Sequence, residues 1–577
     1  MSEELTHHTL LVAWGEFAQR IGLVEKIQAI DLHQKTVVHS PQTKVLEFFV
    51  AVLGGLEHLQ DLSCAAHPIE KDRAVARAWG QPGWADYSGV SRCLSALTES
   101  EARRIAAVLE EISRPILNAE VMQALAQAGE LCYDGDLTGR PISNTSTTYP
   151  GAAYGHMGDA VNFGYQAAMV SFHSPTYGRF WLSSTLHPGD VVSCTQAEAL
   201  VLAAEAKSGM RPLRRTDLLA QRIQQLSSQH QTLEEQAAET RSQQQAMQAE
   251  LATLPEQISE WQQKVEALKN APPKRGRRPL RRIAKAHAKV QRLRRRQERL
   301  KEKLNRMEKR LVARQERLDE CIRLEQTLKD RLERFERDNQ TNTFPISATF
   351  RRDAGFGTRE NLALLIEMGY QAYTKPYADW LTPRLKQQAQ QMKWSRVGNN
   401  AEMVAWKDYQ PADFPYPLDV GLERFYTGKA QRYGTLVHFG PDPVTTDLPG
   451  WFHRYNARQT IEAGIKEGKQ VFQMQHLKVR SAPAIYLQEQ FAIFAANFVR
   501  WAARWLSQDC PTIAQPLQVG VKEIVRVAAH TSAVVHFDEQ GVLLRFTDHS
   551  VYAGRSIQIP KNWAFQLALP FANNASL

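Results

Sequence analysis

Two long polar segments with regularly spaced apolar residues constrain the fold of this chain more than any other feature. In both segments, residues 219–268 and 290–335, apolar side chains recur at steps of four and three. Heptad spacing of this kind is typical of coiled coils. The segments are nearly equal in length and are separated by the Pro- and Gly-rich sequence 270–279. We therefore predict an antiparallel coiled-coil hairpin over residues 211–340, roughly 80 Å long and kinked at Pro255.

The positive charge of the chain is concentrated at the predicted tip of this hairpin. Residues 271–310 carry 18 Lys and Arg against 3 Glu, whereas the whole chain has a net charge of +10. A cluster of this density attracts a polyanion such as DNA without any need for sequence recognition. The alternative is a solvated coiled-coil face that dimerises or binds a partner protein. The candidate DNA-binding residues at the tip are Arg275, Arg277, Arg278, Arg281 and Arg282.

A second pattern lies in the C-terminal third of the chain. Tyr455, Arg458, Glu462 and Lys469 follow one another at steps of three, four and seven. This spacing predicts that all four side chains lie on one side of a single helix. Such a face would place a metal-binding carboxylate among groups that bind phosphate. The alternative is an ordinary charged amphipathic helix.

Three aspartates upstream are candidates for further metal ligands. Asp353 ends an extended run that begins at Ile346, and a Gly-containing turn and an apolar helix follow it. Asp134 and Asp136 stand two residues apart on a predicted strand, and so on the same face of its sheet. Two carboxylates that project together are costly unless a cation or hydrogen-bond donors satisfy them. For Asp353, the alternative is that it merely begins a turn.

The spacing of the C-terminal pattern resembles the YREK signature of bacterial insertion-sequence transposases of the DDE type. In that signature the Glu is the third catalytic acid. The resemblance therefore implies that Glu462 is catalytic and that Tyr455, Arg458 and Lys469 bind DNA. The segment that follows Asp353 is similar to the family's pattern of Asp, small residue, Gly, aromatic residue and Gly before a helix.

The resemblance also extends to the first acid, which in this family often stands in an Asp-x-Thr or Asp-Gly context. Asp136 fits the first context and Asp134 the second. We favour Asp136 and keep Asp134 as the alternative. The resemblance implies an α/β fold with a ribonuclease-H-like catalytic core, in which Asp136, Asp353 and Glu462 bind two Mg²⁺ or Mn²⁺ ions. Two such ions stabilise both the attacking and the leaving oxygen of phosphoryl transfer.

The function implied by this resemblance is that of a DNA transposase. Such an enzyme cleaves double-stranded DNA at the ends of a transposable element and transfers the strands into target DNA, and we expect it to act as a homodimer. The alternative is a catalytically inactive, transposase-derived protein that binds DNA or serves as a scaffold. The presence of all three acids argues against this alternative.

The domain order expected from the sequence places the hairpin inside the catalytic core. The predicted parts are a helical N-terminal DNA-binding module (1–125), the first part of the core (126–210), the hairpin (211–340), the second part of the core (341–375), a β-rich insertion (376–450), the final core helices (451–510) and a small C-terminal β subdomain (511–577). In the N-terminal module, Gly89 to Leu94 begins either a recognition helix or a core-packing helix.

The expected location is the cytoplasm, with no attachment to a membrane. The sequence begins with no recognisable signal peptide, and its most apolar late segment, Phe491 to Leu506, is too short and too charged to span a bilayer. The six Cys residues are scattered and form no CxxC motif. This distribution favours a reducing compartment over a disulfide framework or a zinc site.

Overall fold

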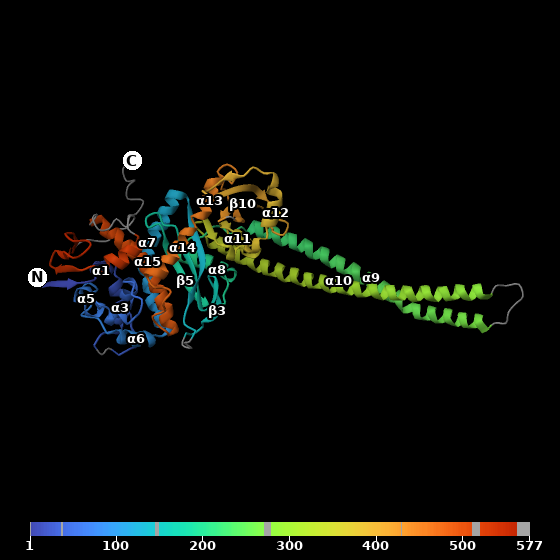
Figure 1. The fold of residues 1–577 in the computed structure, drawn as a ribbon, viewed down its shortest axis with the longest axis horizontal. Coiled ribbons are helices and arrows are strands. Elements are labelled where there is room, and N and C mark those ends of the chain that lie inside the picture. The colour runs from blue at the N-terminus through green and yellow to red at the C-terminus, as the bar shows by residue number, and fades with distance from the viewer. Residues whose placement is uncertain are drawn as a thin grey trace. The chain divides into compact units, whose positions relative to one another are not determined.

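The computed structural model describes residues 2–35, 38–144, 149–270, 279–428, 430–442, 444–509 and 520–561. The chain forms a mixed α/β structure and divides into two compact units. One unit combines Met1–Leu213 with Asn342–Leu577, and the other is Arg214–Thr341 (Figure 1).

A mixed sheet of ten strands runs through the first unit within the described ranges. The strands pair in the order β3-β4-β2-β6-β7-β11-β10-β9-β8, and β5 also pairs with β4. At β2 the pairing changes from antiparallel to parallel. Strand β2 is antiparallel to β4 but parallel to β6, and β6 is parallel to β7. The strands are β2 (Glu130–Pro141), β3 (Ala153–Met157), β4 (Ala160–Phe172), β5 (Phe180–Pro188), β6 (Ser347–Arg352), β7 (Gln371–Thr374), β8 (Ser395–Arg396), β9 (Ala401–Tyr409), β10 (Leu418–Thr427) and β11 (Ala430–Phe439).

The segment predicted as a β-rich insertion extends this sheet. Its strand β11 pairs antiparallel with β7, with Val437 opposite Thr374 and Phe439 opposite Ala372. Pairing with β11 satisfies backbone groups that β7 would otherwise expose at a sheet edge. Two helices, α11 (Arg359–Glu367) and α12 (Thr382–Gln388), lie in the chain on either side of β7.

The N-terminal residues are mostly helical, and they share a core with a helix from the far end of the chain. Phe49 of α3 contacts three rings of α15, with centroids 5.2 Å from Phe491, 5.6 Å from Phe494 and 5.9 Å from Phe498. The helices concerned are α1 (Thr9–Arg20), α2 (Leu23–Gln28), α3 (Pro41–Leu53), α4 (Asp61–Cys64), α5 (Arg73–Ala78), α6 (Tyr87–Ser95), α7 (Glu99–Ala128) and α15 (Ala482–Asp509).

Local sequence explains where several of these helices begin. Asp86 caps α6 by accepting a hydrogen bond from the backbone of Gly89, and Thr98 caps α7 in a capping box with Glu101. Helix α6 buries Val90, Cys93 and Leu94. One face of the helix therefore packs into the core while Tyr87 and Arg92 stay exposed, which leaves both the core-packing and the recognition-helix interpretation open.

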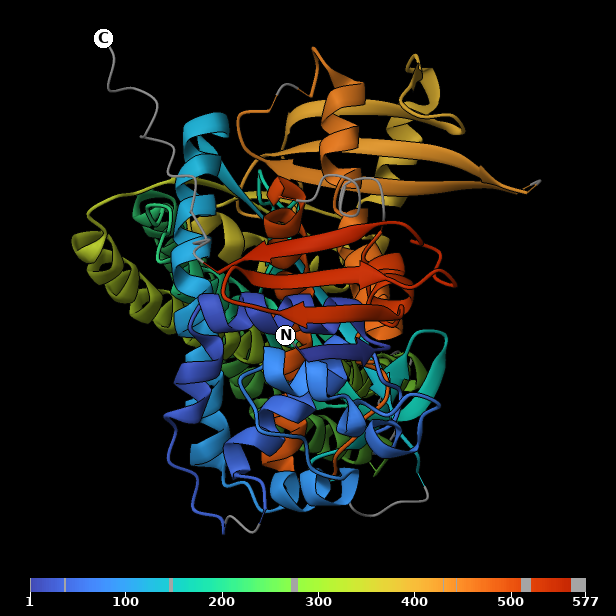
Figure 2. The ribbon, with the colours of Figure 1, turned by 90° about the vertical axis from the view of Figure 1, so that its left-hand side faces the viewer.

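A second, smaller sheet joins the two ends of the chain. Strand β1 (Ser2–Thr6) pairs antiparallel with β12 (Ala533–Phe537), and β13 (Gly541–Phe546) and β14 (Ser556–Pro560) complete the sheet (Figure 2). The sequence did not predict strand β1, although the rest of the expected N-terminal module, where the structure describes it, contains helices and no further strand. Strand β1 is five residues long and includes two Glu, so it shows too little apolar alternation to be recognised from sequence.

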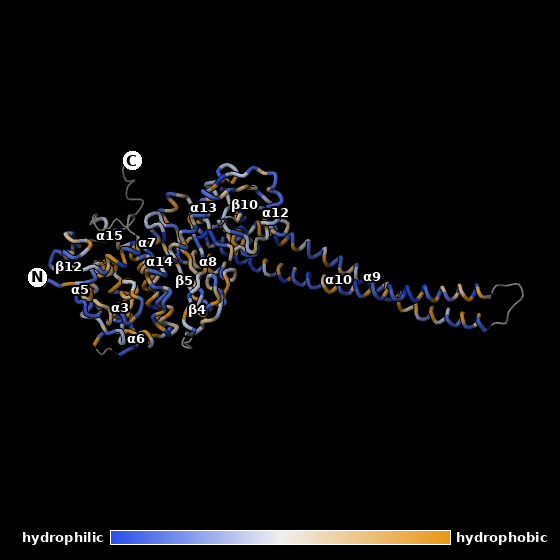
Figure 3. The backbone as a smooth tube through the Cα atoms, viewed as in Figure 1, coloured by the Kyte–Doolittle hydropathy of each residue, from blue (hydrophilic) through white to orange (hydrophobic). Residues whose placement is uncertain are grey.

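The second unit consists of two long helices, α9 (Thr216–Asn270) and α10 (Pro279–Thr341), and α9 continues through Pro255. Residue numbers rise along one helix as those of their partners fall along the other: Ser227 Oγ lies 2.7 Å from Glu325 Oε1, and a guanidinium nitrogen of Arg241 lies 2.8 Å from Gln315 Oε1. Apolar residues recur along both helices (Figure 3). Their buried seam includes Leu254, Ile258, Val265, Ala286, Val290, Leu293 and Leu300. The two helices therefore pack as an antiparallel pair.

The chain leaves the first unit and returns to it at neighbouring points. The side-chain amide of Asn342 donates to the carbonyl oxygen of Arg211 at 3.0 Å, and the backbone N–H of Ile346 donates to the same oxygen at 3.3 Å. Because these points are adjacent, a long helical pair can stand between β5 and β6 in the chain without separating the strands of the sheet. Within the described ranges, none of the helices has the length and apolar composition needed to cross a lipid bilayer.

Candidate active site

Tyr455, Arg458 and Glu462 lie at the junction between two helices, which we call the corner, and Lys469 lies in the last turn of the second helix. Helix α13 (Leu448–Asn456) ends just before Ala457, and α14 (Gln459–Val471) begins just after Arg458. The expectation of one uninterrupted helix was therefore wrong. Ala457 and Arg458 both keep helical dihedral angles (Arg458 φ −56°, ψ −32°), so the interruption is a two-residue turn between the helices.

The four side chains of the pattern lie in different surroundings. Tyr455 is buried, and its ring belongs to a core cluster that includes Trp451 and Phe452. Burial raises the pKa of its hydroxyl group. A ring packed in this core is not exposed for stacking on a nucleotide, and the expected contact of Tyr455 with DNA stays a prediction. Glu462, in contrast, has a side chain that is 59% exposed.

Asp136 and Asp353 approach each other because β2 and β6 are parallel neighbours. Gly135 lies opposite Arg352 in this pairing, so Asp136 and Asp353 are the next residues along the two chains. Asp353 begins the short 3₁₀ turn Ala354–Phe356 and accepts a hydrogen bond from the backbone of Gly355 at 3.1 Å. It therefore begins a turn, as the alternative interpretation held, and at the same time it faces a second acid.

Arg458 connects the first and third acids of the predicted set. One guanidinium nitrogen lies 3.2 Å from Asp136 Oδ2, and another lies 2.8 Å from Glu462 Oε1. The Arg458 side chain is only 6% exposed, so both ion pairs are shielded from solvent on the arginine side. The structure thus places Arg458 between two of the acids, and its expected contact with DNA stays a prediction.

The electrostatics of this group show an excess of negative charge. Burial raises the pKa of Asp136 to about 7; the charge of Arg458 opposes this rise, and the charges of Asp353 and Glu462 add to it. Burial also raises the pKa of Asp353 despite the charge of Arg458. One arginine thus stands among three carboxylates, and an additional cation would stabilise their ionised forms.

The donor set suits a hard cation. Carboxylate oxygens are the ligands that Mg²⁺ prefers, and Mg²⁺ commonly needs only one or two of them because it keeps waters and substrate oxygens in its shell. In the part of the chain that the structure describes, no three His, Cys, Asp or Glu residues are grouped closely enough to hold a metal ion. The three acids therefore do not form an assembled metal site in this conformation, and ligation by Glu462 would replace its ion pair with Arg458.

Asp134, the alternative first acid, lies in a different environment from Asp136. Its carboxylate accepts two hydrogen bonds from Arg351, at 2.7 Å and 3.0 Å, and one from Arg179 at 3.4 Å. Nε2 of His173 lies 2.7 Å from the same group. Burial alone would raise the pKa of Asp134, but the hydrogen bond with His173 and the charge of Arg351 lower it to about 2. Protein groups thus already satisfy both oxygens of Asp134, which leaves less need for a cation there than beside Asp136.

Lys469 belongs to a second buried group of charges near the acids. Burial lowers its pKa to about 8, and the nearby charge of Arg140 contributes. Arg140 is buried and forms an ion pair with Glu489 at 3.1 Å. Sequence reasoning did not select Arg140, although it stands four residues after Asp136 and therefore on the same face of β2.

Sequence reasoning also missed the residues that surround Asp134. Arg351 could have been noticed, because it stands two residues before Asp353 on the same predicted strand and hence on the same face. Arg179 and His173 carry no such signal, since they reach Asp134 only through the pairing of neighbouring strands.

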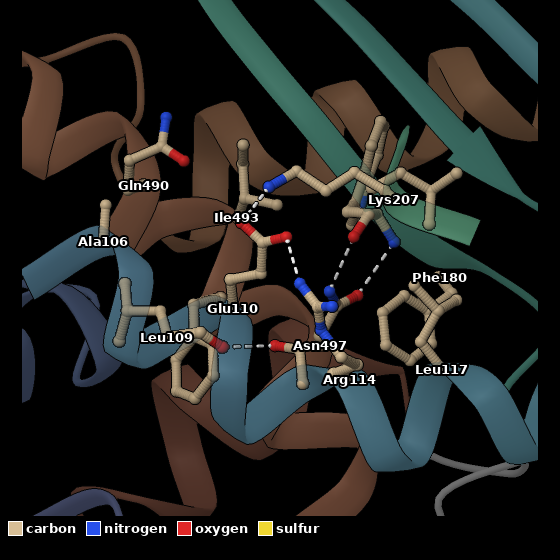
Figure 4. Close-up of a pocket in the computed structure, with 14 residues that line it drawn as sticks. Ala106, Leu109, Glu110, Arg114, Leu117, Phe180, Lys207, Gln490, Ile493 and Asn497 are labelled. Carbon is tan, nitrogen blue, oxygen red and sulfur yellow. Dashed lines mark hydrogen bonds and ion pairs between the residues drawn. The ribbon is translucent and has the colours of Figure 1, made fainter. Parts of the chain in front are cut away.

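A separate pocket of about 70 Å³ lies between α7, β5, α8 (Ala197–Ser208) and α15 (Figure 4). Its charged side chains pair with one another: Glu110 lies 2.5 Å from Lys207 and 3.0 Å from Arg114. Asn497 forms two hydrogen bonds with the backbone of Trp181, each of 2.9 Å. None of the predicted acids lines this pocket, so it is not part of the candidate site.

The basic tip of the hairpin is described only in part. Arg281 and Arg282 lie near the start of α10 and are exposed. Arg275, Arg277 and Arg278 lie outside the described residues.

Comparisons with known proteins identify no family for this chain: no model of a protein family matches it, and no curated protein is similar to it. The arrangement of Asp136, Asp353 and Glu462 around Arg458 is therefore the main basis for a functional proposal.

Proposed function

We propose that the protein is a DNA transposase of the DDE type, which cleaves DNA at the ends of a transposable element and joins those ends to target DNA. The observation that carries this proposal is the grouping of three acids from β2, the end of β6 and α14 around one arginine. These acids are far apart in the sequence, and their approach is what a metal-dependent phosphoryl transferase requires.

The arrangement of the sheet supports a ribonuclease-H-like core. Strand β4 is antiparallel to both of its neighbours β5 and β2, and the strands β6 and β7 continue the sheet parallel to β2. Along the chain, the four strands β2 to β5 precede α8, and β6, which leads into Asp353, the helix α11 and the helix α14 with Glu462 come later. The expected order had three strands before the first helix, and the short hairpin strand β3 is additional to it.

The residues of the site have distinct roles under this proposal. Asp136 and Asp353 hold Mg²⁺, and Glu462 adds a carboxylate from the exposed start of α14. When bound, the metal ions would stabilise negative charge on the attacking and leaving oxygens of the phosphodiester. Arg458 holds Asp136 and Glu462 near each other, and Lys469 supplies positive charge beside them for a DNA phosphate.

The direct test is a cleavage assay on the DNA that flanks this gene in its own genome. Purified protein is incubated with labelled duplexes that carry each boundary of the element, in Mg²⁺, Mn²⁺, Ca²⁺ or EDTA. We expect strand cuts at the boundaries in Mg²⁺ and Mn²⁺ and none in EDTA. Specific binding of the same duplexes without cleavage in any metal would instead identify an inactive, DNA-binding derivative.

The hairpin supplies a second prediction, which concerns DNA affinity. Glu250 and Arg296 form an ion pair across the helices, so joining these two residues by a short neutral turn would remove the tip and keep the remaining pairing. We expect DNA affinity to fall, and the slope of log affinity against log salt to flatten by about 0.9 for each phosphate that the protein no longer neutralises. Both are measured by fluorescence anisotropy over a salt series.

A charge variant separates the effect of the tip's charge from that of its length. Arg281→Gln combined with Arg282→Gln retains the full hairpin, and its salt slope should flatten by roughly 1 to 2. An unchanged slope in both proteins, together with loss of self-association in the shortened one, would show that the hairpin serves assembly rather than DNA binding.

A further inference from the structure

Two arginines from the main sheet and its edge donate hydrogen bonds to the corner between α13 and α14. Arg351, on β6, donates a hydrogen bond to the backbone carbonyl of Arg454 in α13 at 2.6 Å. Arg179, which stands just before β5, donates to the side-chain oxygen of Thr460 in the first turn of α14. One arginine thus contacts each side of the turn that carries Arg458.

Both arginines are anchored by the same buried carboxylate. Asp134 accepts hydrogen bonds from Arg351 and from Arg179, and all three side chains are at most 7% exposed. Arg179 also donates to the hydroxyl of Ser171 on β4. Side chains held by several hydrogen bonds in a low-dielectric interior have little freedom to move.

The hydroxyl group of Thr460 joins Arg179 to the backbone of the turn between α13 and α14. Its hydroxyl donates to the backbone carbonyl of Ala457 at 2.7 Å, so its lone pairs remain to accept from Arg179. The residue before α14, Arg458, makes no side-chain capping hydrogen bond. The contact between Arg179 and Thr460 therefore links the otherwise uncapped start of α14 to the sheet.

A glycine in α14 provides an independent sign that this helix must approach Arg179 closely. A Cβ atom at Gly464 would lie 2.8 Å from the ring of Trp181 and 3.2 Å from Cδ of Arg179. Such distances are shorter than normal van der Waals contacts, so any larger residue at this position would push α14 away from the sheet.

We infer that Asp134, Arg179 and Arg351 form a clamp that positions the α13–α14 corner, and with it Arg458 and Glu462, opposite Asp136 and Asp353. The inference rests on the proposed function, since it concerns the alignment of the acids for that reaction. The clamp residues touch neither substrate nor metal and act through Thr460 and the backbone of Arg454. They are positioning residues rather than catalytic ones.

Thr460→Val is the test variant, because it removes only the hydroxyl group from an exposed, isosteric side chain and so should fold normally. We expect a 10- to 100-fold lower cleavage rate and a higher Mg²⁺ concentration for half-maximal rate, which is about the effect of losing an outer partner of a metal ligand. DNA affinity and thermal stability should stay close to the wild-type values. Thr460→Ser keeps the hydroxyl and should restore the rate.

Thr327→Val is the matched control, because the hydroxyl of Thr327 is also exposed but bonds only to a carbonyl of its own helix. It should behave like the wild type. Gly464→Ala should reproduce the effect of Thr460→Val by displacing α14 from Arg179. Equal rates and equal Mg²⁺ dependence in Thr460→Val and Thr327→Val would overturn the clamp.

Hydrogen exchange provides a readout that does not depend on catalysis. In Thr460→Val, the amides of residues 459–463 should exchange faster than in the wild type, whereas those of β2 and β6 should not change. If no DNA is cleaved even by the wild type, the proposed function fails, and this exchange pattern still decides whether the clamp exists. Unchanged exchange in residues 459–463 would refute the clamp even in an active enzyme.

Discussion

Asp136→Asn, Asp353→Asn and Glu462→Gln are each expected to reduce Mg²⁺-dependent DNA cleavage by roughly a thousandfold. The charge stabilisation that a bound metal supplies amounts to several kcal/mol, and each 1.36 kcal/mol corresponds to a factor of about ten in rate. Specific DNA binding should change little, because the basic residues that contact phosphates remain. Single-turnover cleavage and anisotropy on the same duplexes measure the two effects separately.

The matched control for these variants is Glu467→Gln. Glu467 lies on the same helix as Glu462, but it pairs with Arg500 at 2.7 Å and does not face the other acids. Its cleavage rate should remain within a few-fold of the wild-type rate. Near-normal cleavage by any one of the three acid variants would remove that residue from the proposed metal site.

The second large effect is expected on stability rather than on chemistry. Asp134→Asn should lower the free energy of unfolding by about 3 to 5 kcal/mol, because it leaves the buried charges of Arg351 and Arg179 without their carboxylate. Asp136→Asn is the natural comparison, since it changes the same residue type two positions along the same strand. Burial disfavours the charged form of Asp136, so Asp136→Asn should not lower the free energy of unfolding by a comparable amount.

The pH dependence of stability distinguishes the same two residues. The pKa of Asp134 is about 2 in the folded protein, below the ordinary value of 3.8 expected when the chain unfolds. The stabilisation is therefore present above pH 4 and is lost as the pH falls towards 2, with a total of about 2 kcal/mol. Denaturant unfolding of the wild type between pH 2 and pH 5 should show this loss, and Asp134→Asn should lack it. Parallel curves for the two proteins would show that Asp134 is not held as an anion.

Periodicity was sufficient to predict the second unit, because a coiled coil depends on a local repeat. The apolar residues of α9 and α10 recur at heptad spacing, and the two helices pack against each other along this seam. The same reasoning placed Asp136 and Asp353 at strand positions, since alternation and turn residues are also local signals.

Local reasoning could not decide between Asp134 and Asp136, because both lie on one face of one strand. The difference comes from the parallel neighbour β6. Its Arg351 lies opposite Asp134, and its last residue, Arg352, lies opposite Gly135, so that Asp353 follows beside Asp136. An arginine opposite the first aspartate satisfies it within the protein. Asp353, in contrast, lies beside Asp136 and adds negative charge that a cation could neutralise.

By itself, the sequence determined the helical hairpin, the strands that carry the acids and the spacing that points to phosphoryl transfer. The tertiary structure alone decided that the helix of the C-terminal pattern is interrupted at Ala457 and Arg458, that the inserted strands extend the main sheet through β7, and that β1 completes the C-terminal sheet. The physical reason is the same in each case. These features depend on hydrogen bonds and ion pairs between residues tens to hundreds of positions apart, and no local pattern of residues records such partners.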